Sequence, residues 1–391
     1  MRNKKHFFGV RAAAPLLFAV FAAALLSACS YGGDFRSDSR SDFRLPDLDE
    51  AAGQMLIVGV RCEVINDEII SLLYDLKPGG IILFDYDLPS GGAEKRNISS
   101  PSQLKKLIKN LQALSRTGLF IAADVEGGKV NRLKPKYGFS LDIPPAKKLG
   151  FLPESETYKA AEKIALELRS AGINFNFAPV ADVDINPQSP AIGHLERSFS
   201  RDPQVVASHV AQFARAHREN RVITALKHFP GHGSATEDTH LGVADVTGTY
   251  NRSDELTPYR LLITEGYDGA VMTAHIINKK LDDEPATLSR KILSGLLRGG
   301  LGFKGVIVSD DMQMGAIVKR YGLEQAVIKS INAGVDIVII GNQIGEYDKT
   351  AAARVRDAIV RAVETGVIPR KRIYRSYKRI MEIKKRYGIV E

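Results

Sequence analysis

Cysteine is scarce in this sequence, and its scarcity limits how the fold can be cross-linked. Only Cys29 and Cys62 occur among the 391 residues. If Cys29 is modified, as argued below, Cys62 has no partner within the chain, which excludes an intrachain disulfide. Cys62 lies just after an apolar run. We interpret it as a buried structural thiol with no chemical role.

The chain also lacks an apolar run of membrane-spanning length. Its N-terminal apolar stretch, residues 12–26, has 15 residues, whereas a transmembrane helix needs about 20. Basic residues precede it, a pattern typical of an export signal. The sequence Leu26-Ser27-Ala28-Cys29 then resembles a bacterial lipoprotein box, in which small residues precede a lipidated cysteine. We expect residues 1–28 to be a signal peptide and Cys29 to carry the lipid that anchors the exported protein to a membrane. Cleavage near Ala28 without lipidation is the alternative.

Aliphatic residues are nearly absent from residues 30–44, which are polar and charged and cannot bury a core. We therefore expect residues 29–45 to form a flexible tether between the membrane and the folded part. From there to the end we find no composition break, low-complexity linker or repeat of fixed period. We expect one domain over residues 46–391, acting as a monomer.

Neither sign of charge dominates the chain beyond the signal. The net charge of +9 includes four basic residues of that signal, so +5 remains, and we expect no nucleic-acid partner. Basic residues gather in residues 370–386, where nine Lys and Arg accompany Glu382 alone. Apolar residues recur there at helical spacing. We expect a helix docked by its apolar stripe with a solvated basic face; attraction to anionic lipid or cell-wall polymer is the alternative.

Eight short apolar runs, separated by helix-length gaps, indicate the fold class. They are residues 55–60, 80–84, 119–123, 173–177, 222–226, 269–274, 305–309 and 335–340. This α/β alternation predicts a (β/α)8 barrel of the TIM type as a single catalytic domain, rather than an open sheet. Residues 85–95, which contain Gly and Ser, follow the second run and are expected to form a surface insertion at the barrel mouth.

Polar and ionisable residues follow most of these runs. They are Asp124, Asp182, Lys227, His228, His275, Asp310 and Asn342, and Pro179 also follows the fourth run. Because α/β barrels build their active sites at the carboxyl ends of the strands, we expect these side chains to meet in one site.

Residues 227–240 hold three of the eight histidines beside a lysine and two carboxylates. Pro230, Gly231 and Gly233 exclude a regular helix, so we expect a functional loop. Asp238 can accept a hydrogen bond from one ring nitrogen of His240, which leaves the other nitrogen to move a proton near neutral pH. A solvent-exposed loop histidine is the alternative.

A carboxylate at the tip of a buried strand is a candidate nucleophile, and we select Asp310 for that role. Two adjacent aspartates point to different sides, so we interpret Asp311 as a cap on the following helix. A zinc or iron site made of His228, His232, Asp238 and His240 is a competing hypothesis. No His-x-His pair or helical His-x-x-x-His supports it, and the Pro-Gly turn sends His228 and His232 apart. We predict no metal.

Several runs, in order, resemble the β-N-acetylglucosaminidases of glycoside hydrolase family 3. The specific ones are Lys-His-Phe-Pro-Gly-His-Gly at 227–233 and Asp-x-His at 238–240. Weaker matches are residues 124–132, 177–183, 197–199, 272–275 and 309–314. The resemblance covers roughly residues 50–385. Lys129 stands where arginine is more usual, and residues 234–237 differ from the expected pattern. Larger members carry a second α/β domain, and we expect the single-barrel bacterial type here.

The resemblance implies a retaining, two-step glycosidase. Asp310 would attack the anomeric carbon, while His240, held by Asp238, would protonate the leaving oxygen and then activate water. The residues implied to bind the sugar are Asp124, Arg132, Arg197, Lys227, His228 and His275. Both steps use protein side chains, so no metal or organic cofactor is expected.

We therefore expect an exported, lipid-anchored exo-β-N-acetylglucosaminidase whose partners are an N-acetylglucosamine-containing glycan, from the cell wall or elsewhere, and the membrane. Three alternatives remain open. They are a β-glucosidase or β-xylosidase of the same family, a phosphorylase that uses phosphate in place of water, and a non-catalytic lipoprotein that binds wall sugars.

Overall fold

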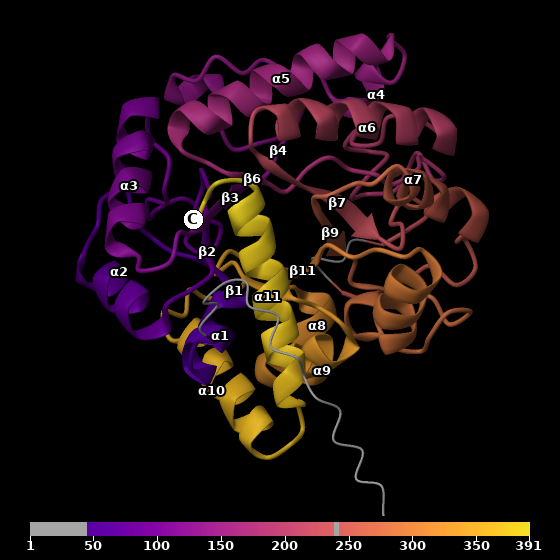
Figure 1. Cartoon of the computed structure of the whole chain (residues 1–391). Helices are drawn as coiled ribbons and strands as arrows, with labels where there is room; N and C mark the ends of the chain where they lie inside the picture. Colours follow the sequence, from indigo (N-terminus) through magenta and orange to yellow (C-terminus); the bar gives the residue numbers. More distant parts are fainter. Residues whose placement is uncertain (1–44, 238–241) are drawn as a thin grey trace, which may run out of the picture. The chain divides into compact units, whose positions relative to one another are not determined.

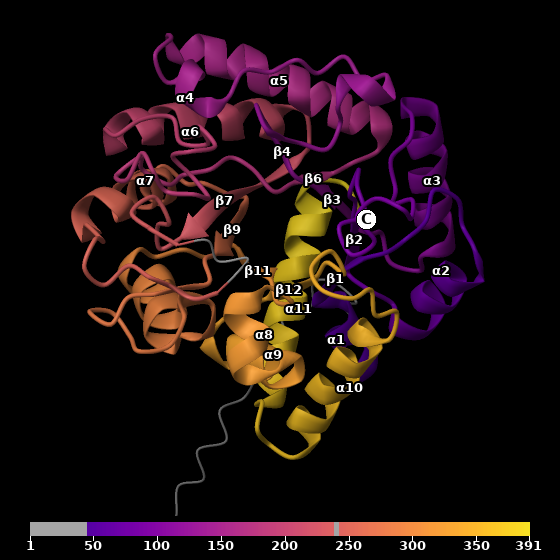
Figure 2. The same cartoon turned by 180° about the vertical axis from the view of Figure 1, so that it is seen from behind.

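Eight parallel strands close into a barrel in the computed structural model of the chain, which describes residues 45–237 and 242–391 (Figures 1 and 2). The barrel strands are β1 (Leu56–Gly59), β2 (Gly80–Ile82), β3 (Phe120–Ala123), β6 (Phe175–Asn176), β7 (Ile223–Phe229), β9 (Ala270–Thr273), β11 (Val306–Asp311) and β12 (Ile337–Ile340). Strand β1 pairs with both β2 and β12, which closes the circle. Each strand overlaps one of the eight predicted apolar runs, and the predicted (β/α)8 barrel is confirmed.

Two pairs of short strands lie outside the barrel. Strands β4 (Val125–Gly127) and β5 (Val130–Asn131) are antiparallel, and β8 (Ala244–Asp245) pairs in parallel with β10 (Ile276–Ile277). Strand β4 follows β3 and β10 follows β9, so both pairs extend the loops at the carboxyl ends of barrel strands.

Helices surround the barrel. They are α1 (Leu48–Gln54), α2 (Asp67–Ser71), α3 (Pro101–Leu114), α4 (Ala146–Leu149), α5 (Glu154–Ala171), α6 (Pro203–Glu219), α7 (Arg252–Thr264), α8 (Gly315–Tyr321), α9 (Leu323–Ala333), α10 (Ala351–Glu364) and α11 (Arg370–Arg386), with short 3-10 or π segments η1 (Leu72–Leu76), η2 (Pro135–Tyr137), η3 (Ala286–Leu288) and η4 (Lys291–Gly300). Local sequence sets several starts: Ser100 and Asp202 cap α3 and α6, and each is followed by proline at the first helical position.

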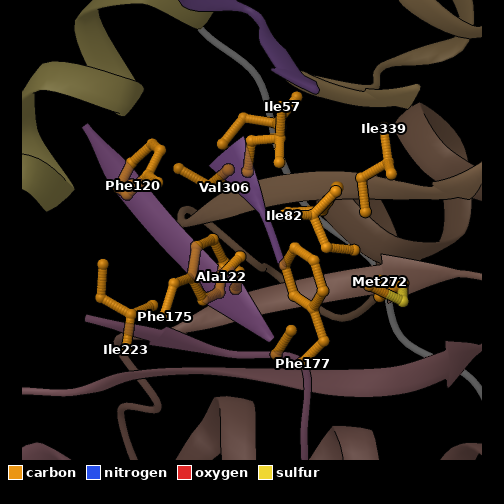
Figure 3. Packing of buried hydrophobic residues seen from close by; sticks show 14 of the residues in the cluster. Ile57, Ile82, Phe120, Ala122, Phe175, Phe177, Ile223, Met272, Val306 and Ile339 are labelled. Atoms are coloured by element: carbon orange, nitrogen blue, oxygen red, sulfur yellow. The ribbon is translucent and has the colours of Figure 1, made fainter. Parts of the chain in front are cut away.

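Apolar side chains fill the barrel interior (Figure 3). The rings of Phe120 and Phe175 meet edge to face at 5.4 Å, and those of Phe175 and Phe177 at 4.9 Å. Phe177 and Met272 also border the cavity described below. The top of the core is therefore the apolar floor of that cavity.

Helix α11 covers the end of the barrel where the strands begin (Figure 1). Lys384 donates to Gln54 Oε1 at 2.8 Å and lies 4.7 Å from the centre of the Phe120 ring. Gln54 precedes β1, and Phe120 begins β3. Burial lowers the pKa of Lys384 to about 7. Apolar residues of α11 are buried against the barrel, so the predicted docked helix over residues 370–386 is confirmed.

Asp336, which lies just before β12, holds neighbouring helices to the same end of the barrel. Its carboxylate pairs with Arg298 at 2.5 Å, Arg372 at 3.2 Å and Arg379 at 3.1 Å. Burial opposes its charge, but the three arginines outweigh burial and hold the pKa of Asp336 below its ordinary value.

Cys62 is buried, as predicted for a structural thiol, and burial raises its pKa to about 12. Within residues 45–237 and 242–391, no helix has both the length and the apolar character needed to cross a membrane.

Candidate active site

A cavity of about 430 Å³ opens at the carboxyl ends of the barrel strands. Six of the residues predicted for the site border it: Asp124, Arg132, Arg197, Lys227, His228 and Asp310. The predicted insertion contributes Asp85, Tyr86 and Leu88 to its wall. Residues distant in the sequence therefore meet where the fold predicts an active site.

The structure corrects the predicted start of the 227–240 loop. Lys227 and His228 lie inside β7, which ends at Phe229, so the loop begins at Pro230. The pairing of β7 with β9 shifts register between Leu226 and Phe229. Both side chains are buried, and this irregular strand end places them on the cavity wall.

Asp182 orients the histidine of this strand end. Its Oδ2 lies 2.7 Å from His228 Nδ1, and its Oδ1 accepts from the backbone N–H groups of His228 at 3.1 Å and His232 at 2.8 Å. Because an ionised carboxylate only accepts, Nδ1 of His228 carries the proton. Its Nε2 then faces Arg197, whose Nη2 lies 3.5 Å away. Burial opposes the charge of Asp182, but His228 outweighs it and lowers the pKa of Asp182.

Lys227 joins two carboxylates across the cavity wall. Its Nζ lies 2.9 Å from Asp124 Oδ1 and 2.6 Å from Glu126 Oε1. Arg197 donates two hydrogen bonds to the same Glu126 carboxylate, from Nε to Oε2 at 2.9 Å and from Nη2 to Oε1 at 2.8 Å. Burial disfavours the charged form of each group, but the oppositely charged neighbours outweigh burial. They lower the pKa of Glu126 and raise the pKa values of Lys227 and Arg197. Glu126, Lys227 and Arg197 are therefore ionised and fixed near neutral pH.

Arg132 is held more loosely at the rim. Its guanidinium lies 3.5 Å from Asp124 Oδ2 and 3.6 Å from Asp85 Oδ1. Both distances exceed those of good hydrogen bonds, so Arg132 retains donors for a ligand. Lys134 holds Asp85 from the other side at 2.6 Å.

Asp310 and Asp311 end β11 beside the cavity. The pairing of β11 with β12 shifts register between Val308 and Asp311, which marks a bulge at this end of the strand. Both aspartates border the cavity, contrary to the expectation that one alone would face it. Oδ1 of Asp311 accepts from the N–H groups of Gln313 at 3.0 Å and Gly341 at 3.2 Å.

The predicted helix cap at Asp311 is wrong. The residue preceding α8 is Met314, and no side chain caps that helix. Asp311 instead holds the turn after β11 to the end of β12, which also fixes the backbone next to Asp310.

His275 lies beneath the site rather than on the cavity wall. Its Nε2 is 2.9 Å from the backbone oxygen of Asp311, and its Nδ1 is 2.8 Å from Thr287 Oγ1. The carbonyl oxygen can only accept, so Nε2 donates. His275 therefore holds the backbone of Asp311, next to Asp310, and its predicted contact with the substrate stays a prediction.

The predicted pair Asp238 and His240 lies outside the described residues, as does Cys29. The described loop before that pair is closely packed. His232 is buried, and burial together with His228 lowers its pKa to about 4. Beneath the loop, Glu255 of α7 is fully buried, and burial raises its pKa to about 8.

Sequence reasoning missed Glu126 and Asp85 as parts of the site, and it placed Asp182 there without giving it a role. Glu126 lies within residues 124–132, which match the family pattern, and Asp182 follows a predicted strand. The sequence therefore indicated that both residues lie near the site. Their partners come from other strands, and only the fold shows the pairing.

The arrangement suits a neutral, hydroxyl-rich ligand. An apolar floor can contact the face of a ring, while fixed charged donors and acceptors surround it. A carboxylate on the wall can attack or stabilise an electron-poor carbon. These are the parts that glycoside cleavage requires.

Comparison with known proteins identifies the family. The profile described as "Glycosyl hydrolase family 3 N terminal domain" matches residues 47–383. A protein of Stenotrophomonas maltophilia named Beta-hexosaminidase is 35% identical over 295 residues, which cover 73% of this chain and 83% of that protein.

Solved structures agree with this assignment. A family 3 β-N-acetylglucosaminidase from Paenibacillus is 34% identical with a TM-score of 0.79; the match covers 88% of this chain and 63% of that one. A β-N-acetylhexosaminidase from Beutenbergia cavernae is 29% identical with a TM-score of 0.77, covering 87% and 99%. The chain described here therefore belongs to glycosyl hydrolase family 3 and is a glycoside hydrolase.

Proposed function

We propose that this protein is a retaining exo-β-N-acetylglucosaminidase that removes terminal N-acetylglucosamine from peptidoglycan fragments or other glycans. The observation that carries the proposal is the position of Asp310 at the end of β11, in a cavity that also presents Arg132, Lys227 and His228. The β-hexosaminidase and β-N-acetylglucosaminidase names of the relatives support the choice of sugar.

In the proposed first step, Asp310 attacks the anomeric carbon, and the bond to the leaving oxygen breaks as His240 protonates that oxygen. In the second step, His240 takes a proton from water, and the water oxygen displaces Asp310 from the sugar. Asp238 would orient His240 throughout. Retaining enzymes need the two reacting groups about 5–5.5 Å apart, so the loop after Glu237 must bring His240 close to the sugar.

The other wall residues would bind the sugar. Arg132 and Asp124 offer a donor and an acceptor to neighbouring hydroxyls, and Arg197, Lys227 and His228 form a rigid surface around them. Because their mutual ion pairs already fix these side chains, little conformational entropy is lost when a sugar binds.

The test is hydrolysis of p-nitrophenyl N-acetyl-β-glucosaminide, with the β-glucoside in parallel. We expect turnover of the N-acetyl sugar alone, and we expect Asp310→Asn, which keeps the shape but removes the charge, to lower kcat by at least about a thousandfold. NMR of the first-formed product should show retained configuration. Inverted product, or full activity of Asp310→Asn, would refute the mechanism.

Adding phosphate separates hydrolase from phosphorylase. We expect the rate and the free sugar product to be unchanged. Formation of sugar 1-phosphate would identify phosphate as the acceptor, and binding of the sugar without turnover would identify a non-catalytic glycan-binding protein.

We also propose that residues 1–28 are a signal peptide, that Cys29 is lipidated, and that residues 29–45 tether a monomeric barrel to the membrane. The support is the Leu26-Ser27-Ala28-Cys29 sequence and the polar composition that follows it. Mass spectrometry of the N-terminal peptide from membranes would show the acyl chains. A soluble protein with an unmodified Cys29 would refute the anchor.

A further inference from the structure

The outer side of α11 is a basic stripe. Its buried residues Ile373, Tyr377, Ile380 and Ile383 face the barrel. On a helix, residues three and four apart share a side, so the exposed residues opposite them also align. The exposed charged residues of this side are Lys371, Arg375, Lys378, Glu382 and Lys385, with Arg370 and Arg386 at its ends.

The charge of this stripe is mostly available to a partner. Arg372 and Arg379 are paired with Asp336, and Lys384 is buried, so these three do not contribute. Lys378 lies 3.9 Å from Glu382, and both side chains are exposed, a geometry that contributes little. Six exposed basic residues thus face solvent with one exposed acid on the same helix.

Neighbouring loops extend the stripe. Exposed Arg221 precedes β7 and lies beside Gly388, and exposed Lys304 precedes β11 and borders a groove with Arg386. We call these two residues together with the six exposed basic residues of α11 the basal surface.

The acidic residues at this end of the barrel are fewer and partly paired. They include Glu265 and Asp268 before β9, Glu391 after α11, and Asp47, Asp49 and Glu50 at the start of α1. Asp49 and Glu50 pair with Arg356 and Lys77 at 3.7 Å each. The basal surface therefore remains positive.

The chain enters the domain beside the basal surface. The hydroxyl of Tyr374 in α11 donates to the backbone oxygen of Pro46 at 3.2 Å, just before α1. The described part of the chain therefore begins at this end, and a stretch as long as residues 29–45 can span at most roughly 55–60 Å. The cavity opens at the opposite end of the barrel, where the strands end.

We propose that the basal surface binds the anionic headgroups of a lipid membrane, so that the cavity faces away from the bilayer toward glycan. Clustered lysines and arginines beside an anionic leaflet are attracted within a Debye length. A basic patch and a lipid chain act together as two membrane signals, each weak alone. The contact goes beyond the glycosidase activity and does not depend on it.

Vesicle flotation tests this proposal on the chain from Ser30 onward, which contains the whole closed barrel but no lipid. The protein is mixed with vesicles of phosphatidylcholine alone or with added phosphatidylglycerol, at low and high salt. The test variant is Lys371→Glu/Arg375→Glu/Lys378→Glu. The matched control is Lys105→Glu/Lys106→Glu/Lys109→Glu, which makes the same charge change at exposed positions of α3.

We expect the parent chain to float only with phosphatidylglycerol vesicles, and high salt to release it. The α11 variant should bind these vesicles about a hundredfold more weakly, because three favourable contacts are lost. The α3 variant should bind within about threefold of the parent, and both variants should keep the parent melting temperature and turnover of the p-nitrophenyl substrate.

Equal loss in both variants would attribute binding to net charge and overturn the assignment to α11. Binding to neutral vesicles, or no binding to either kind, would overturn the proposal outright. Binding to a soluble polyanion without binding to anionic vesicles would assign the surface to a polymer instead of the membrane.

Discussion

At the scale of single residues, the buried charges in this site are stable because oppositely charged groups lie beside them. Lys227 is almost fully buried between Asp124 and Glu126, and Arg197 forms a further ion pair with Glu126. Removing one member of a buried ion pair costs more than the pair itself contributes, because the remaining charge stays desolvated. The cavity wall therefore also contributes to the stability of the domain.

We expect Lys227→Met to lower the free energy of unfolding by about 3–5 kcal/mol, because Asp124 and Glu126 lose their shared cation. Urea denaturation measures the change. Lys129→Met, at an exposed position nearby, is the control and should stay within about 0.5 kcal/mol of the parent. A loss below about 1 kcal/mol in Lys227→Met would show that the carboxylates find other partners.

Glu255 predicts a dependence of stability on pH. Burial raises its pKa to about 8 in the folded protein, whereas an unfolded glutamate titrates near about 4.3. The folded state therefore holds an extra proton between these values, and its stabilising contribution is lost as pH rises through this window. Glu255→Gln cannot ionise, so it should remove this component.

Melting temperatures of the parent and Glu255→Gln, measured from about pH 5 to pH 9, test this directly. We expect the two proteins to differ little at the acidic end and Glu255→Gln to be the more stable at the alkaline end. Parallel curves would mean that Glu255 ionises within the folded protein at little cost.

At the scale of elements, the loop after β7 is fixed by close backbone packing. A Cβ built on Gly233 would lie 1.7 Å from the backbone oxygen of Val183. The loop cannot accept that atom without moving, and Asp238 and His240 follow it in the sequence.

We expect Gly233→Ala to lower kcat/KM about a hundredfold, because a displacement of about 1 Å in a catalytic loop has an effect of that size. Gly248→Ala is the control, since nothing lies within 4 Å of a Cβ built there. The p-nitrophenyl assay compares the two. Similar activities would show that the loop adjusts freely.

The strands could be predicted from the sequence because each is a buried apolar run, as residues 119–123 and 335–340 illustrate. The ends of the strands could not be predicted in this way. Lys227 and His228 carry polar side chains, so the pattern ended β7 before them, although ion pairs make their burial possible. Asp311 suits a helix cap by type and position, but the backbone N–H of Gly341, just after β12, donates to its carboxylate instead.

At the scale of the whole molecule, the two ends of the barrel serve different purposes. The cavity lies where the strands end, and the closure by α11 and Asp336 lies where they begin. In α/β barrels the first end carries catalysis and the second carries stability. A change at the second end should therefore alter unfolding without altering turnover.

Asp336→Asn tests this separation. Its carboxylate is fully buried among Arg298, Arg372 and Arg379, and it accepts from Ser376 Oγ at 2.6 Å. Neutralising it leaves three guanidinium groups without their shared anion, and we expect a loss of about 3–5 kcal/mol in the free energy of unfolding.

Well below its melting temperature, Asp336→Asn should retain kcat/KM within about twofold of the parent, because its carboxylate contacts nothing in the cavity wall. Asp142→Asn, at an exposed position, controls for the loss of one negative charge. A fall in kcat/KM that matches the loss of stability would mean that the α11 end and the cavity are coupled through the strands. A stable variant with parent activity would mean that α11 is held by its apolar contacts alone.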